Sequence, residues 1–339
     1  MRILVTGAAG FIASRLIPRL RAEGHWVRGA DILRKNVGGV ACDDYVLTGL
    51  HHSPQDRLFA GGIDRVYHLA ALQGGVAFKD KRFLAPAVNN LLVDLNVLTA
   101  AMKYGAERIL FTSSVCIYPR RHTRRFNALP LRENLAWLGE PEDGYGKAKL
   151  MSEDLFSYAF TEHQQSIRIA RLENVYGPGV VYEGDRAKAP GEIARKVLEA
   201  PDGGEVEVYG DGDQRRQFLY VDDAVDGLVR LMESPICLVV NLAGPEQVSI
   251  NDLVFIVSEI AGKIVTIKHL PVNQGAHTRS VPTDVARAAL KWSPGVGIHA
   301  GMRELVLWLR GELADKRDPD GPEPSRMHER IATHADTRG

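Results

Sequence analysis

The amino-acid sequence predicts an α/β protein in which a smaller α/β lobe is interleaved with a doubly wound parallel sheet. Short apolar runs alternate with amphipathic stretches through the first half of the chain, which is the pattern of successive βαβ units. A turn with two glycines joins the first apolar run to the first amphipathic stretch. After residue 177 the pattern becomes irregular and then returns to strand and helix, which indicates a second, smaller lobe that interrupts the first.

The first half of the chain supplies the strands of the predicted sheet and the helices between them. The predicted strands are short apolar runs at residues 2–6, 26–31, 45–47, 66–70, 108–113 and 167–172. The predicted helices are amphipathic stretches at residues 11–22, 91–104 and 145–160. In the second half we predict a strand at 218–221 and helices at 223–232, 249–260, 283–290 and 298–313.

These elements divide into two domains and a tail. Residues 1–172 form the predicted sheet domain, and residues 213–242 return to it. Residues 173–212 and 243–314 form the smaller lobe. The tail, residues 315–339, is charged, contains prolines and is poor in apolar residues, so we expect it to be mobile.

Composition and charge exclude several classes of protein. The chain has 339 residues, of which 45% are hydrophobic and 25% charged, so it is not a disordered chain. Lys plus Arg and Asp plus Glu both number 42, so no overall positive field exists to bind nucleic acid or an anionic membrane. The 3 cysteines form no disulfide framework and no metal-binding spacing. With no signal peptide or membrane span expected, we predict a soluble cytoplasmic protein without a metal site.

The turn after the first predicted strand has the composition of a dinucleotide-binding turn in a Rossmann-type domain. Gly7 permits the tight turn, and Gly10 lets a phosphate approach the backbone. Phe11 and Ile12 open the following helix, whose N-terminal N–H groups and dipole hold a pyrophosphate. The sequence therefore predicts a dinucleotide cofactor at this turn.

Asp31 ends the second predicted strand and favours NAD as that dinucleotide. A carboxylate at this place accepts hydrogen bonds from the adenosine ribose and repels a 2′-phosphate. Arg34 and Lys35 follow closely and are the features that favour NADP instead.

Tyr145 and Lys149 are candidates for proton and hydride transfer. They are four residues apart at the start of a predicted helix, so their side chains share one face. A tyrosine acts as a base near neutral pH only if its pKa falls from about 10 to about 7, which corresponds to roughly 4 kcal/mol. The Lys149 ammonium is one source of that change. Ser114 stands near the end of the preceding predicted strand, at the sheet edge where such folds bind ligands.

Four stretches together resemble the extended short-chain dehydrogenase/reductase family, the nucleotide-sugar epimerases and dehydratases, across residues 1–312. They are Thr6 to Ala13, His68-Leu69-Ala70-Ala71, Ser113-Ser114 and the Tyr145/Lys149 pair. The resemblance implies a NAD-binding Rossmann domain, with Ala70 beside the cofactor, and a lobe that binds a nucleotide sugar. It also implies that Tyr145 is the catalytic base and that Lys149 lowers the tyrosine pKa and holds the nicotinamide ribose. The same resemblance implies that Ser114 positions the reacting sugar oxygen.

A second set of residues resembles the GDP-mannose 3,5-epimerases within that family. The set comprises Cys116 and residues 73–75, 171–178 and 184–190. The resemblance implies that Cys116 and Lys188 are the acid and base on opposite faces of the sugar. It also implies that Asn174 contacts the sugar nucleotide and that Gly74 and Gly75 let the backbone approach the hexose.

The family resemblance also implies which residues bind the diphosphate of the substrate and that the protein forms a dimer. Arg216 and Arg279 are candidate diphosphate ligands, because a guanidinium fork matches phosphate oxygens. Helices 91–104 and 150–160 correspond to the family's dimer contact, so we expect a homodimer.

An epimerisation at C3 or C5 of a hexose explains why a cysteine and a lysine would be needed. These protons become removable only when C4 is oxidised to a ketone, which Tyr145 and NAD achieve by taking a proton and a hydride. Cys116 and Lys188 then exchange the carbon-bound proton, and the hydride returns to C4. Three alternatives stay open: a 4-epimerase, which needs no Cys116, a 4,6-dehydratase, and a non-catalytic NAD-binding protein. The nucleotide base and the sugar are also open.

Overall fold

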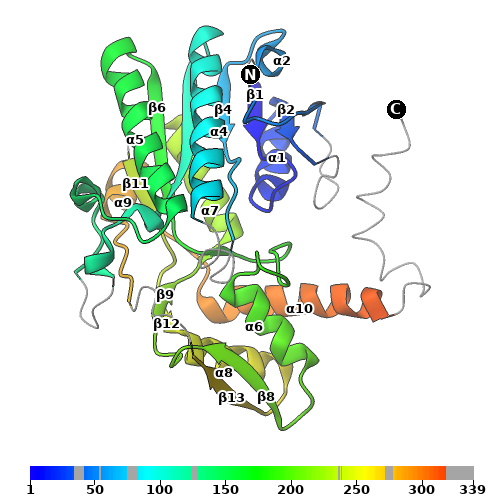
Figure 1. The fold of residues 1–339 in the computed structure, drawn as a ribbon. Helices are drawn as coiled ribbons and strands as arrows, with labels where there is room; N and C mark the ends of the chain where they lie inside the picture. The colour runs from blue at the N-terminus through cyan, green and yellow to red at the C-terminus, as the bar shows by residue number, and fades with distance from the viewer. Residues whose placement is uncertain are drawn as a thin grey trace.

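A computed structural model gives the fold (Figure 1) and describes residues 1–33, 42–52, 55–74, 83–123, 129–235, 237, 239–271 and 278–317. Its centre is a sheet of seven parallel strands in the order β11-β6-β5-β4-β1-β2-β3. The strands are β1 (Arg2–Thr6), β2 (Trp26–Asp31), β3 (Asp44–Leu47), β4 (Arg65–His68), β5 (Arg108–Ser114), β6 (Ser166–Leu172) and β11 (Val239–Leu242). The predicted α/β class with a doubly wound parallel sheet is confirmed.

The strand register brings the ends of the central strands to one edge of the sheet. Thr6, the last residue of β1, pairs with Ala30 of β2 on one side and with His68 of β4 on the other. The order of strands reverses at β1, and in open α/β sheets ligands bind at such a switch point beyond the carboxyl ends of the strands.

Helices cover both faces of the sheet. One face packs against α1 (Ala13–Ala22), α7 (Val221–Glu233) and α9 (Asp284–Leu290). The other packs against α2 (Asp56–Phe59), α4 (Leu84–Lys103) and α5 (Gly144–His163). Both layers are held by buried aliphatic side chains such as Leu16 and Ile17 of α1 and Val93 and Val97 of α4, which are almost fully removed from water.

A smaller lobe with its own core lies below the sheet in Figure 1. It contains α6 (Ala189–Glu199), β8 (Gly204–Tyr209), β9 (Arg215–Gln217), β12 (Gln247–Ser249), α8 (Ile250–Ala261), β13 (Val265–Leu270) and α10 (Ile298–Arg317). The predicted capping box begins α8, because the Ser249 side chain accepts the Asp252 N–H and the Asp252 carboxylate accepts the Ser249 N–H. The short parallel pair β7 (Val175–Tyr176) and β10 (Leu219–Tyr220) lies between the two cores.

Some elements differ from the sequence expectation. Helix α4 begins at Leu84 and not at 91, because Pro86 lies in its first turn, where no backbone N–H is needed. Strands β7, β8, β9, β11, β12 and β13 and helices α2 and α6 were not expected. Helix α9 packs into the sheet core, whereas the predicted boundaries assign residues 243–314 to the lobe. Those boundaries stay a prediction, and Arg34, Lys35, Gly75 and tail residues 318–339 lie outside the described residues.

Helix α4 is, among the described residues, the one helix long and apolar enough to cross a membrane by length and composition. No stretch of this kind was predicted from the sequence. The helix nevertheless packs against the sheet through Val93, Val97 and Leu98, and it carries the fully buried Asp94. It is therefore placed in the structure as a core helix of the sheet domain.

Candidate active site

A cleft of about 1670 Å³ lies at the carboxyl edge of the sheet and continues into the smaller lobe. Gly7, Asp31 and Tyr145 line it from the sheet domain, and Lys188 and Arg216 line it from the smaller lobe. Its volume exceeds the roughly 300–1,000 Å³ typical of a pocket for one small ligand. It therefore has room for a dinucleotide and a second ligand.

The turn between β1 and α1 has the geometry that a pyrophosphate needs. Gly7 has φ +70°, and a Cβ at this position would lie 2.9 Å from the backbone of Ala70. Gly10 donates its N–H to the Gly7 carbonyl at 2.9 Å. Phe11, Ile12 and Ala70 also line the cleft here, so all the residues predicted for this turn meet.

Asp31 lies beside this turn at the end of β2. Its carboxylate accepts the N–H of Ala9 at 3.1 Å and that of Leu33 at 3.0 Å, and it still lines the cleft. These bonds fix the carboxylate next to the turn, where it would meet the adenosine ribose. The residues present fit NAD.

Ser114 and Tyr145 line the same cleft and are in contact with each other. The Ser114 hydroxyl accepts the N–H of Cys116 at 3.2 Å and is hydrogen-bonded to the Tyr145 phenol. Gly146 allows α5 to approach closely, because a Cβ there would lie 2.3 Å from the Cys116 carbonyl oxygen. Asp143 begins α5 by accepting the Gly146 N–H at 2.7 Å.

The pKa of Tyr145 is raised in this structure, which is opposite to the direction expected from Lys149. Burial is the largest cause, and the charges of Cys116, Asp94 and Asp143 add to it, whereas the hydrogen bond to Ser114 lowers the pKa. Lys149 itself is completely buried and does not line the cleft.

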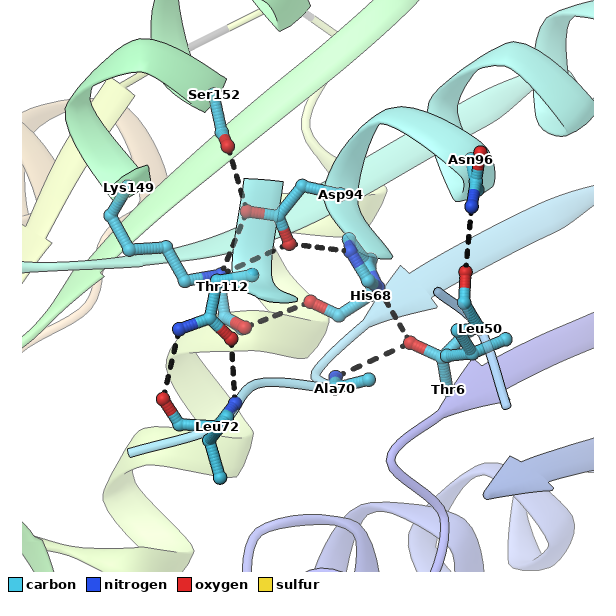
Figure 2. Close-up of polar contacts among 11 residues, drawn as sticks. Thr6, Leu50, His68, Ala70, Leu72, Asp94, Asn96, Thr112, Lys149 and Ser152 are labelled. Carbon is cyan, nitrogen blue, oxygen red and sulfur yellow. Dashed lines mark hydrogen bonds and ion pairs between the residues drawn. The ribbon is translucent and has the colours of Figure 1, made fainter. Parts of the chain in front are cut away.

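The partner of Lys149 is Asp94, a residue that the sequence analysis did not identify. Lys149 Nζ lies 3.3 Å and 3.4 Å from the two carboxylate oxygens of Asp94, as Figure 2 shows. Burial lowers the pKa of Lys149, and the Asp94 carboxylate opposes that change. The signal available in the sequence was a single carboxylate within the otherwise uncharged run from Leu84 to Met102.

Cys116 and Lys188 reach the same cleft from different lobes. Cys116 lies on the short 3₁₀ helix Val115–Ile117 directly after β5. Lys188 precedes the first turn of α6. The structure therefore brings together the two side chains predicted to exchange protons with carbon.

Two arginines, Arg216 and Arg279, lie close together beside Cys116. Burial, together with the charge of Arg279, lowers the pKa of Arg216 to about 10. Burial also acts to lower the pKa of Arg279, but Cys116, Glu173, Glu142 and Asp143 together raise it. The Arg279 guanidinium donates to Glu142 Oε2 at 3.3 Å.

Both arginines line the cleft, as predicted for diphosphate ligands. Arg216 does so from strand β9.

Asn174 and Gly74 also line the cleft. Asn174 has φ +34°, and its side-chain amide donates to Glu173 Oε1 at 2.6 Å. Gly74 is buried at the end of the segment after β4. Gly75, its predicted companion, lies outside the described residues.

This fold and this site together define an enzyme class, the extended short-chain dehydrogenases/reductases that act on nucleotide sugars. The sequence model of the NAD dependent epimerase/dehydratase family matches residues 3–243, and the chain belongs to this family. The family description names NAD, which confirms the predicted cofactor.

Relatives of the chain have different activities. The chain is 32% identical over 320 residues to GDP-mannose 3,5-epimerase of Arabidopsis thaliana, which covers 94% of this chain and 84% of that protein. It is 28% identical over 349 residues to UDP-glucuronic acid decarboxylase 1 of Xenopus tropicalis, and this match covers 98% of this chain and 78% of that protein. The solved structure of a UDP-glucose 4-epimerase of Thermotoga maritima with UDP-glucose superposes with a TM-score of 0.83 at 26% identity. The match covers 92% of this chain and 100% of that chain. These similarities establish the family and the nucleotide-sugar class.

Proposed function

We propose that the chain catalyses NAD-dependent epimerisation of a nucleotide sugar resembling GDP-mannose at C3, C5 or both, through a transient 4-keto sugar. The observation that carries this proposal is that Cys116 and Lys188 line one cleft together with Tyr145. Inversion at C4 alone needs no proton exchange at C3 or C5, so it would not require Cys116 or Lys188 as an acid or a base. The similarity to GDP-mannose 3,5-epimerase supports the same choice.

The reaction divides between two groups of residues. Bound NAD supplies reversible removal of hydride from the sugar. Tyr145, which is hydrogen-bonded to Ser114, takes the proton of the C4 hydroxyl, and the role given to the Lys149 ammonium is to stabilise the resulting phenolate. One of Cys116 and Lys188 then removes a proton from the carbon next to the ketone, and the other returns a proton from the opposite face. Because lysine is normally protonated near neutral pH, Lys188 is the proton donor and Cys116 is the base.

The remaining site residues bind the two ligands. Gly7, Gly10, Phe11, Ile12, Asp31 and Ala70 hold the dinucleotide, while Arg216 and Arg279 bind the substrate diphosphate. Asn174, Gly74 and Gly75 contact the sugar nucleotide. The carboxylate of Glu142 must share Arg279 with the diphosphate, because it already accepts one of the Arg279 hydrogen bonds.

Incubation with nucleotide sugars in deuterated water tests this function. The panel contains GDP-, ADP-, UDP- and dTDP-sugars, and the products are analysed by NMR. We expect deuterium at C3 or C5 of a hexose with inversion at the labelled carbon.

A product inverted only at C4, without label at C3 or C5, would contradict the proposal. It would favour the 4-epimerase alternative, which the similarity to UDP-glucose 4-epimerase supports. Loss of water from the sugar would identify the 4,6-dehydratase alternative, and binding of NAD without any turnover would identify a non-catalytic protein.

We further propose a cytoplasmic homodimer joined through α4 and α5. These neighbouring helices expose the apolar side chains Val88, Leu92, Leu95, Met151 and Tyr158. Exposed apolar patches of this kind mark interaction sites. The domain boundaries predicted from the sequence, 1–172 with 213–242 and 173–212 with 243–314, are also proposed, except that α9 packs into the core of the sheet domain.

A further inference from the structure

A network of buried polar side chains connects β1, β4, α4 and α5 (Figure 2). Thr6 Oγ1 lies 2.6 Å from His68 Nδ1, and His68 Nε2 lies 2.9 Å from Asp94 Oδ1. Asp94 in turn contacts Lys149 Nζ at 3.3 Å and accepts the Ser152 hydroxyl at 2.8 Å. All five side chains have no more than 1% of their surface exposed. The network therefore joins the residue before Gly7 to the helix that carries Tyr145.

The hydrogen bonds allow one arrangement of protons in this network. Burial raises the pKa of Asp94, but Lys149, His68 and Ser152 together lower it, so the group is a carboxylate that only accepts. Burial lowers the pKa of His68, so its ring is neutral. His68 must then donate from Nε2 to Asp94 and accept at Nδ1 from the Thr6 hydroxyl. Thr6 Oγ1 accepts the Ala70 N–H at 3.3 Å, so each of these groups has a partner.

Lys149 needs such a counter-ion because it has no access to water. A buried ammonium without a partner gives up its proton, and a neutral Lys149 could not support a Tyr145 phenolate. Asp94 contacts Lys149 with both oxygens, and Nζ also lies over the Phe111 ring, 4.2 Å from the ring centroid. His68 holds one carboxylate oxygen and Ser152 the other, so the carboxylate is fixed from two elements.

We propose that Asp94 is a positioning residue for the reaction: its carboxylate, fixed by His68 and Ser152, keeps Lys149 protonated and sets the place of its ammonium. This inference rests on the proposed function, which assigns hydride transfer to Tyr145 and Lys149. Asp94 is not among the residues that line the cleft, so it would act on the reaction through Lys149.

The sign of its effect on pH dependence follows from charge. Lys149 faces Asp94 of α4, His68 of β4 and Glu153 of its own helix, which is paired with Arg171 of β6. Tyr145 faces Asp94 as well as Cys116 and Asp143. Removing one negative charge lowers the pKa of every group nearby, by about 1–3 for a charge within ~4–6 Å. Loss of the Asp94 charge therefore moves both limbs of the pH profile to lower pH.

Asp94→Asn tests the proposal because it keeps the shape and an oxygen for His68 but removes the charge. In the NAD-loaded enzyme we expect the alkaline limb of the kcat profile to move to lower pH by about one unit or more. The substrate KM should change less than about threefold, since Asp94 lies outside the cleft. Asn96→Ala is the matched control on the same helix. The Asn96 side chain donates a hydrogen bond to the Leu50 carbonyl and makes no hydrogen bond to Asp94, His68 or Lys149 in the described structure. A profile of the Asp94→Asn enzyme that matches the wild type would overturn the proposal.

Thermal unfolding gives a second measurement that does not depend on turnover. Asp94→Asn leaves Lys149 buried without a counter-ion, so the variant should have a lower Tm than wild type at pH 7. Its Lys149 binds its proton less tightly in the folded than in the unfolded chain, so folding stability rises with pH and the deficit narrows toward pH 10. The double variant with Lys149→Met should be more stable than Asp94→Asn alone.

The two measurements separate this inference from the proposed function. If the wild type turned over no nucleotide sugar, the proposed function would fail, while the pairing of Asp94 with Lys149 would be judged by Tm. A deficit that is the same at pH 7 and pH 10, with no recovery in the double variant, would overturn the inference.

Discussion

Cys116 lies where several groups of the site meet. Its backbone N–H is held by Ser114, and its side chain interacts electrostatically with Tyr145 and with the buried Arg279. The proposed mechanism uses Cys116 to move a proton from carbon, whereas Tyr145 serves the hydride step. The two steps can therefore be separated by substitution.

Cys116→Ala should leave oxidation at C4 intact and reduce epimerisation by a factor of about 10² to 10⁴, the usual contribution of a positioned acid or base. Deuterium entry at C3 and C5, followed by NMR, measures the lost step, and the absorbance of reduced cofactor measures the one retained. We expect the same result for Lys188→Met: C4 oxidation is retained and epimerisation is reduced.

The contrasting variant is Tyr145→Phe, which should abolish both steps because no ketone forms. The assignment of Cys116 would be wrong if its alanine variant incorporated deuterium at the wild-type rate.

At the scale of elements, the turn between β1 and α1 depends on one glycine. Gly7 combines a positive φ with a backbone contact to the segment after β4, so a side chain would push Ala70 away from the turn. Gly24, just after α1, also has a positive φ, +82°, but has nothing within 4 Å of where a Cβ would stand. The two glycines therefore differ only in the close contact.

Gly7→Ala should yield protein without bound NAD, while Gly24→Ala should retain it. Both variants carry the roughly 1–2 kcal/mol cost of a left-handed conformation for an L-residue, so stability alone does not separate them. The measurement is the nucleotide released on denaturation of each purified protein. Retention of NAD by Gly7→Ala would contradict the close approach of the turn to Ala70.

At the scale of the whole molecule, the exposed apolar face of α4 and α5 accounts for the expected dimer. Leu92→Glu places a charge on that face and should convert the dimer to a monomer, because an unpaired charge is costly at an apolar interface. Sedimentation gives the mass in solution. Phe255→Glu is the control, since Phe255 is an exposed apolar residue of α8 in the other lobe. A monomeric wild type, or equal effects of both variants, would refute the contact.

Local sequence patterns predicted much of the fold. The strands of the sheet domain are short apolar runs between turns, and β1 and β2 have the predicted bounds. Strands β8 (Gly204–Tyr209) and β13 (Val265–Leu270) were not predicted, and both are short segments with several exposed residues. They form strands because they pair with each other across more than 50 residues, which no local pattern records.

The sequence by itself determined the dinucleotide turn at Gly7 and Gly10 and the shared helix face of Tyr145 and Lys149. These features depend on backbone conformation and on spacing within one element. Only the tertiary structure decided that Lys149 is buried against Asp94, and that Cys116 and Lys188 line one cleft. The physical reason is that charge and burial depend on neighbours from other strands and helices. Asp94 lies 55 positions before Lys149, and only the packing of α4 against α5 brings them into contact.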